Sequence, residues 1–98
     1  MKYNSDAIVA SILAAIDKIP GTYHSDFYIG ITNNIERRLS EHNVDENDCI
    51  KILEATNKDE AEMAETTLIH CGLKGGPGGG TDDTKFVYCY RITDDTNP

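Results

Sequence analysis

The stretch 27–42 constrains the fold of this chain most, because it joins the pattern of a strand to that of a helix through a very short turn. In 27–32 apolar side chains alternate with other residues, which predicts a strand that buries one face and turns Tyr28 toward the other. Asn33 or Asn34 is suited to cap the helix that follows. The stretch therefore predicts one strand–turn–helix unit.

The helix of this unit, which we expect to end near Asn43, carries two side chains that phosphate chemistry uses. Arg38 and His42 lie four residues apart and therefore on one side of a helix. Because Tyr28 stands on the preceding strand, we expect a phenol, a guanidinium and an imidazole to converge.

The rest of the chain alternates between further periodic segments and loops. In chain order we expect a helix within 1–20 that Ser5 or Asp6 caps, a loop over 21–26, the unit described above, a strand over 49–55, a helix over 57–71, a glycine-rich loop over 74–80, a strand over 85–93 and a frayed tail over 94–98. The last strand has Tyr88 and Tyr90 on one face and Cys89 on the other. A length of 98 residues allows one domain, 1–98, with a modest core.

The helix over 57–71 holds one acidic residue with an unusual position. Asn57 and Glu60 form the spacing of a capping box, and an apolar stripe follows them. Glu65 lies at the edge of that stripe, whereas the other acids of the first turns are explained by solubility and the helix dipole. The loop over 74–80 that comes next is not a nucleotide-binding P-loop, because no Gly-Lys-Ser/Thr follows. It is either a phosphate cradle or a plain connector.

Composition narrows the class of protein. The longest apolar stretch, 7–16, is interrupted by Ser11 and has no basic leader, so we expect neither a signal peptide nor a membrane span. We therefore expect a soluble cytoplasmic protein. The three cysteines, Cys49, Cys71 and Cys89, lack CxxC spacing, which argues against a disulfide framework or a zinc site and favours buried thiols. A net charge of −8 repels nucleic acid unless cations gather in one place or a divalent metal offsets the acids.

Taken together, the motif residues resemble the GIY-YIG nuclease domain. The resemblance runs from Tyr28-Ile29-Gly30 through Arg38 and His42, and it continues in the helix of Glu65. It implies an α/β (α+β) fold with a small central antiparallel or mixed three-stranded sheet flanked by helices, to which the N-terminal helix would be an addition. The family's first tyrosine lies in a strand before Tyr28, and here only Tyr23 stands in such a place.

The resemblance also implies a reaction, the hydrolysis of phosphodiester bonds in DNA or RNA with Mg²⁺ or Mn²⁺. If the family's site roles are carried over to this sequence, Glu65 would hold the metal and Arg38 would stabilise charge on the phosphate. Tyr28 would position or activate the water, and His42 would assist proton transfer or hold the phosphate. A carboxylate suits a hard cation, and a cation beside the phosphate stabilises developing charge. Tyr23 is the candidate for the first tyrosine. A domain of this size is expected to need a protein partner or a homodimer for specificity.

Each of these side chains also has a plain structural explanation. Tyr28 is also explained as a strand aromatic and Arg38 as half of a surface ion pair with Glu41 or Asp45. His42 is also explained as a helix-end residue and Glu65 as an exposed acid. Two further functions therefore remain open. One is a catalytically reduced module whose acidic surface binds a basic protein as an inhibitor or adaptor, and the other is a plain α/β domain.

Overall fold

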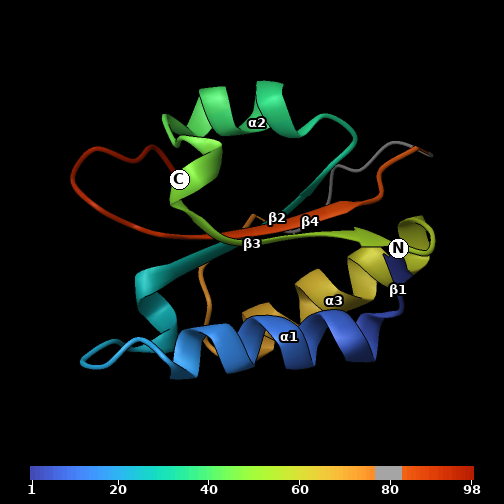
Figure 1. The fold of residues 1–98 in the computed structure, drawn as a ribbon, viewed down its shortest axis with the longest axis horizontal. Coiled ribbons are helices and arrows are strands. Elements are labelled where there is room, and N and C mark those ends of the chain that lie inside the picture. Colours follow the sequence, from blue (N-terminus) through green and yellow to red (C-terminus); the bar gives the residue numbers. More distant parts are fainter. Residues whose placement is uncertain (77–82) are drawn as a thin grey trace.

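A four-stranded mixed sheet forms the centre of the computed structural model, which describes residues 1–76 and 83–98 (Figure 1). The strands are β1 (Lys2–Tyr3), β2 (Phe27–Thr32), β3 (Cys49–Ala55) and β4 (Phe86–Arg91), and they lie in the order β1-β3-β4-β2. β1 runs parallel to β3, and the other neighbours are antiparallel. The predicted α+β class is confirmed. The expected three strands become four, because two residues before the first helix pair with the end of β3 through their backbones.

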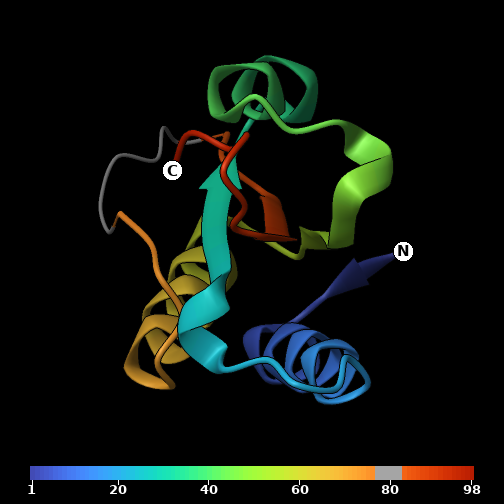
Figure 2. The same cartoon turned by 90° about the vertical axis from the view of Figure 1, so that its left-hand side faces the viewer.

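Three helices cover the two faces of the sheet (Figures 1 and 2). α1 (Ser5–Asp17) and α3 (Lys58–His70) pack on one face, and α2 (Ile35–His42) lies on the other. The larger core, between the sheet and α1 and α3, holds the inward side of β2, including Phe27 and Ile29. A smaller core under α2 contains Leu39. Successive side chains of β2 point to opposite faces of the sheet, and each face is covered by different helices. The strand therefore contributes to both cores.

The helix ends differ in detail from the predicted caps. Asn34 caps α2 and Asn57 caps α3. α1 is capped by Asn4, not by Ser5 or Asp6, because the side chain of Asn4 accepts a hydrogen bond from Ala7 N at 2.9 Å. Glu60 does not complete a capping box. Its Oε1 accepts from Ser5 N at 2.8 Å and so ties α3 to the start of α1.

β4 is the strand that joins the two cores. Cys89 is buried in the larger core, and Tyr88 and Tyr90 are buried in the smaller one. This division matches the predicted faces. β4 lies between β3 and β2, so the side chains of its α2 face are held next to those of β2.

The outer edge of β2 is covered by the residues that follow α3. Ile29 N donates to Lys74 O at 2.8 Å, and Lys74 N donates to Phe27 O at 2.9 Å. A Cβ at Gly75 would lie 2.9 Å from the backbone oxygen of Ile29, so only glycine allows this approach. Of the predicted glycine-rich loop, residues 77–82 lie outside the described residues.

The tail over 94–98 is not frayed, contrary to the prediction. Asn97 N donates to His42 O at 2.7 Å, and Asn43 Nδ2 donates to Asp95 O at 2.7 Å. Carbonyl groups in the last turn of a helix lack partners within the helix. The end of α2 therefore holds the tail through an acceptor, the backbone oxygen of His42, and a donor, the side-chain amide of Asn43.

The cysteines also correct one expectation. Cys89 is buried and Cys49 half-buried, but Cys71 is exposed because it stands past the end of α3. Burial raises the pKa of Cys49 to about 11 and that of Cys89 to about 12, so both are poor nucleophiles. Within residues 1–76 and 83–98, every helix is too short or too polar to cross a membrane.

Candidate functional site

Four aromatic rings gather between the sheet and α2, and they form what we call the tyrosine–histidine cluster: Tyr28, His42, Tyr88 and Tyr90. The ring centroids of Tyr28 and His42 are 4.8 Å apart, and those of Tyr28 and Tyr90 are 5.3 Å apart. The rings of Tyr88 and Tyr90 are nearly parallel, at 2°. β2 supplies one ring, α2 another and β4 two. The predicted convergence of Tyr28 with His42 is therefore present.

Gly30 leaves the space that this cluster needs. It pairs with Tyr88 across the β2–β4 ladder. A Cβ at position 30 would lie 2.3 Å from Cζ and 2.3 Å from Oη of Tyr88. The glycine of the Tyr28-Ile29-Gly30 motif is thus required by the ring of a residue far along the chain.

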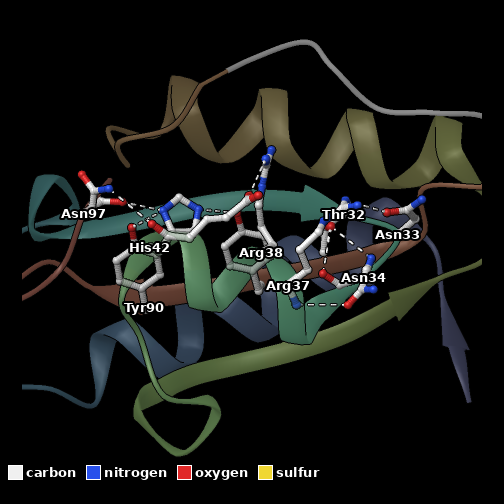
Figure 3. Close-up of polar contacts among 10 residues, drawn as sticks. Thr32, Asn33, Asn34, Arg37, Arg38, His42, Tyr90 and Asn97 are labelled. Carbon is white, nitrogen blue, oxygen red and sulfur yellow. Dashed lines mark hydrogen bonds and ion pairs between the residues drawn. The ribbon is translucent and has the colours of Figure 1, made fainter.

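His42 is buried and bonded at both ring nitrogens (Figure 3). Its Nε2 lies 2.7 Å from the Tyr88 hydroxyl, and its Nδ1 lies 2.8 Å from the backbone oxygen of Asn97. The Tyr90 hydroxyl lies 3.1 Å from Nδ1. The ring is therefore held between β4 and the tail.

Arg38 lies one turn before His42 and faces the same cluster. The contact of its guanidinium with the Tyr88 hydroxyl is the largest of the causes that raise the pKa of Arg38. Its Nη1 also pairs with Glu41 at 3.4 Å, as the plain alternative predicts, but both side chains are exposed and such a pair contributes little. Its Nε is buried and has no hydrogen-bond partner among the described residues. A desolvated donor of this kind is suited to an incoming anion.

Glu65 reaches the site from α3. The residue is only 4% exposed, which contradicts the reading of an exposed helix acid. Burial raises the pKa of its carboxyl to about 7, while the positive charge of Arg38 lowers it and the negative charge of Glu62 raises it further. Burial is the main cause that raises the pKa of Tyr88, and the negative charge of Glu65 adds slightly to it. The carboxyl therefore shares an electrostatic environment with Arg38 and the cluster.

The donors present fit a magnesium-type ion held largely by substrate and water. Among the described residues, no three or more side chains of His, Cys, Asp or Glu come together as a metal cage. Mg²⁺ is commonly bound through one or two carboxylates, with phosphate oxygens and waters as the other ligands. Glu65 offers one carboxylate whose negative charge is disfavoured by burial, so a divalent cation would stabilise its ionised form.

Tyr23, by contrast, is not brought to the cluster. It lies in the turn before β2, is 77% exposed, and its backbone N–H bonds to Asp26 at 2.7 Å. The tyrosine that does meet His42 and Arg38 is Tyr88, which the sequence interpretation did not select. The signal was present, because Tyr88 and Tyr90 alternate along a predicted strand.

The comparisons with known proteins can be set beside this geometry. The family model for the GIY-YIG catalytic domain matches residues 17–73, a range that includes Tyr28, Arg38, His42 and Glu65 but not β4. Searches of curated proteins and of solved structures found no match. The matched range covers more than half of the chain, which therefore belongs to the GIY-YIG family.

Proposed function

We propose that the protein is a metal-dependent endonuclease that hydrolyses phosphodiester bonds in DNA or RNA. The observation that carries this proposal is that the buried carboxyl of Glu65 lies within electrostatic reach of the Arg38 guanidinium, which in turn contacts the tyrosine–histidine cluster at Tyr88. Membership of the GIY-YIG family supports the same reaction class. Mg²⁺ or Mn²⁺ bound at Glu65 would supply charge neutralisation at the phosphate.

Arg38 binds the phosphate in this proposal. Its buried Nε has no partner among the described residues, so a phosphate oxygen would satisfy a donor that is otherwise desolvated without compensation. Arginine presents its donors in a planar fork that matches phosphate. Contacts of this type gain strength as charge develops on the phosphate oxygens during attack.

Tyr88 and His42 move the proton of the attacking water. Burial raises the pKa of Tyr88 well above its ordinary value, so a free phenolate is too costly for Tyr88 to act as a base alone. His42 Nε2 lies 2.7 Å from the Tyr88 hydroxyl. The Tyr88 hydroxyl therefore passes its own proton to the imidazole of His42 and, at the same time, takes the proton of the attacking water. The hydroxide formed attacks phosphorus, the bond to the leaving oxygen breaks, and that oxygen takes up a proton from solvent water.

Tyr28 positions the substrate side of the site. It is half-buried and lines an open pocket of about 510 Å³ together with Lys74, Gly75, Gly76, Ile92 and Pro98. The pocket gives the Tyr28 face of the cluster access to solvent and therefore to a nucleic acid strand. We infer that β4 takes the place of the strand that carries the first motif tyrosine, with Tyr88 in the role expected of Tyr23.

The test is incubation of supercoiled plasmid DNA and of a structured RNA with the protein at low salt, with Mg²⁺, with Mn²⁺ and with a chelator. The matched variant is Glu65→Gln, which keeps the shape of the side chain and removes its charge. We expect cleavage of at least one substrate by the wild-type protein with metal and none by the variant. The proposal is contradicted if the wild-type protein cleaves neither substrate, or if the wild-type protein and the variant cleave equally.

A binding module is the second candidate, because a net charge of −8 is unfavourable for a nucleic acid partner and favourable for a basic protein. It predicts that a basic protein is bound with an affinity that falls with salt, and that no substrate is cleaved. The same cleavage experiment separates the two candidates. If cleavage is found, we expect a second copy or a protein partner to supply specificity.

A further inference from the structure

The segment 93–97 is attached to the end of α2 by several hydrogen bonds, two of which join Asn97 to His42. Asn97 N donates to the backbone oxygen of His42 at 2.7 Å, and the backbone oxygen of Asn97 lies 2.8 Å from His42 Nδ1. Asn97 Nδ2 donates to Glu41 O at 3.3 Å, and Asn43 Nδ2 donates to Asp95 O at 2.7 Å. Asn97 and His42 thus bond reciprocally through backbone and side chain (Figure 3).

The segment is also shaped internally to reach this position. Thr96 N donates to Thr93 O at 3.2 Å, and Thr93 N donates to Thr96 Oγ1 at 3.0 Å, so the chain reverses directly after β4. Ile92 N donates to Asp26 O at 2.8 Å and anchors the start of this turn. The turn returns the chain to α2 from the end of the strand that carries Tyr88.

The chemistry of these groups fixes the position of one proton. A carbonyl oxygen can only accept, so the bond to Asn97 requires the hydrogen on His42 Nδ1. In a neutral imidazole Nε2 is then an acceptor, and the Tyr88 hydroxyl must donate to it. The contact of Arg38 with the Tyr88 oxygen agrees with this direction, because a guanidinium can only donate.

We propose that Asn97 is a positioning residue: its carbonyl holds neutral His42 in the Nδ1–H form, so that Nε2 faces Tyr88 as a proton acceptor. The other groups that face the ring are Tyr28 from β2, and Tyr88 and Tyr90 from β4. Tyr28 meets His42 through its ring, and the hydroxyls of Tyr88 and Tyr90 can donate or accept and so leave the form of the imidazole open. The Asn97 carbonyl lacks that freedom.

The consequence for the reaction rests on the proposed function. With the proton on Nδ1, Nε2 can take the proton that Tyr88 releases, and the resulting imidazolium keeps its Nδ1–H bonded to Asn97. With the proton on Nε2, an N–H would face Tyr88, and that transfer could not occur. A base held in the correct form contributes roughly 10²–10⁴-fold to a rate.

The direct test is nitrogen-15 NMR of the histidine rings of the protein comprising residues 1–98, at a pH where His42 is neutral. Long-range nitrogen–proton spectra distinguish an Nδ1–H ring from an Nε2–H ring. We expect the wild-type protein to show His42 in the Nδ1–H form. A dominant Nε2–H form overturns the proposal whatever the enzymatic activity.

Variants at the tail separate positioning from mere structure. Asn97→Pro removes the N–H that bonds to His42 O, whereas Asn97→Ala keeps both backbone groups and removes only the contact with Glu41. A third variant ends at Thr93. We expect Asn97→Ala to keep the wild-type ring form, and the other two to populate Nε2–H. Retention of the Nδ1–H form in the variant that ends at Thr93 overturns the proposal, as does unfolding of both disruptive variants.

Cleavage assays on the same proteins add the catalytic readout. We expect Asn97→Pro to lower kcat at least about tenfold, with KM changed less than twofold, since a general base acts on the chemical step. An unchanged kcat alongside a changed ring form overturns the catalytic part of the inference. A wild-type protein that cleaves nothing instead contradicts the proposed function, while the NMR result stands independently.

Discussion

The two parts of the chain that build the candidate site differ in what their sequences reveal. The range 17–73 matches a family model and carries Tyr28, Arg38, His42 and Glu65. The range 83–98 lies outside that match, yet it supplies an inner strand of the sheet, two of the four rings and the carbonyl that bonds to His42. The matched part thus supplies Tyr28, Arg38, His42 and Glu65, and the unmatched part adds Tyr88 and Tyr90 and the backbone carbonyl that holds the ring of His42. The predictions below test whether this division is correct.

The largest expected effect lies in the matched part, at Arg38. Arg38→Lys keeps the positive charge but removes the planar fork and the buried Nε. We expect the rate of phosphodiester cleavage to fall about 10²–10³-fold, the range seen when one donor to a developing charge is lost. Single-turnover cleavage measures the change.

Arg37 provides the matched control, because it stands next to Arg38, is exposed and bonds to Asn33 at 3.2 Å. Arg37→Lys should stay within about threefold of the wild-type rate, since an exposed contact contributes little. Equal losses at the two positions would mean that general charge, not the geometry of Arg38, supports the reaction.

The second prediction compares one tyrosine from each part. Tyr88→Phe removes the hydroxyl between Arg38 and His42, and we expect kcat to fall roughly 10–10²-fold, because proton transfer loses its relay. Tyr23→Phe should leave kcat within about twofold, since Tyr23 is 77% exposed and lies away from the cluster. Cleavage kinetics of both variants are the measurement. A larger loss at Tyr23 would restore the assignment that the sequence suggested.

The difference between Tyr23 and Tyr88 shows what sequence could predict. Periodicity identified the elements that carry the motif, because strand and helix patterns are local properties of residues such as those in 27–43 and 57–71. Tyr23 was chosen because it precedes Tyr28 in the chain. Strand order in a sheet is a non-local property, however, and β4 lies beside β2 although Tyr88 is distant from Tyr28 in sequence.

Backbone interactions account for the other differences. β1 has only two residues and pairs through its backbone, so it has no side-chain pattern to detect. The tail is expected to fray because it is a chain end. Its partners are carbonyl groups at the end of α2, whose location relative to Asn97 depends on the whole fold. The burial of Glu65 was predicted only in part, because helical spacing places a residue at an edge without saying what covers it.

The third prediction joins the two parts through packing. Gly30→Ala would place a methyl group 2.3 Å from the ring of Tyr88, which forces a shift of β2 or β4. We expect the free energy of unfolding to fall by about 1–3 kcal/mol, as overpacking in a core does. Urea denaturation measures the loss.

Two further variants check the cause of this loss. Gly76→Ala is the control, because a Cβ there would lie 3.6 Å from the Tyr28 hydroxyl, at ordinary contact distance, and the loss should be within about 0.5 kcal/mol. In a Tyr88→Leu background, Gly30→Ala should cost less than in the wild-type protein. An equal cost in both backgrounds would show that the glycine is needed for backbone reasons and not for the ring.

The last prediction is a dependence of stability on pH that originates at Glu65, in the matched part. Burial raises the pKa of Glu65 from 4.5 to about 7, so between these values the folded protein binds more protons than the unfolded chain, and stability falls as pH rises. The difference amounts to roughly 3 kcal/mol at pH 8. Burial raises the pKa values of Tyr88, Tyr90 and Cys89 as well, which keeps these three groups of β4 neutral throughout that range.

Urea denaturation of the wild-type protein and Glu65→Gln at pH 5, 6, 7 and 8 measures the effect. The variant should gain stability relative to the wild-type protein as pH rises, and Mg²⁺ should reduce that gain, because a cation at Glu65 favours the ionised carboxylate. A gain that does not change with pH would contradict the raised pKa and would weaken the case for a metal at this residue.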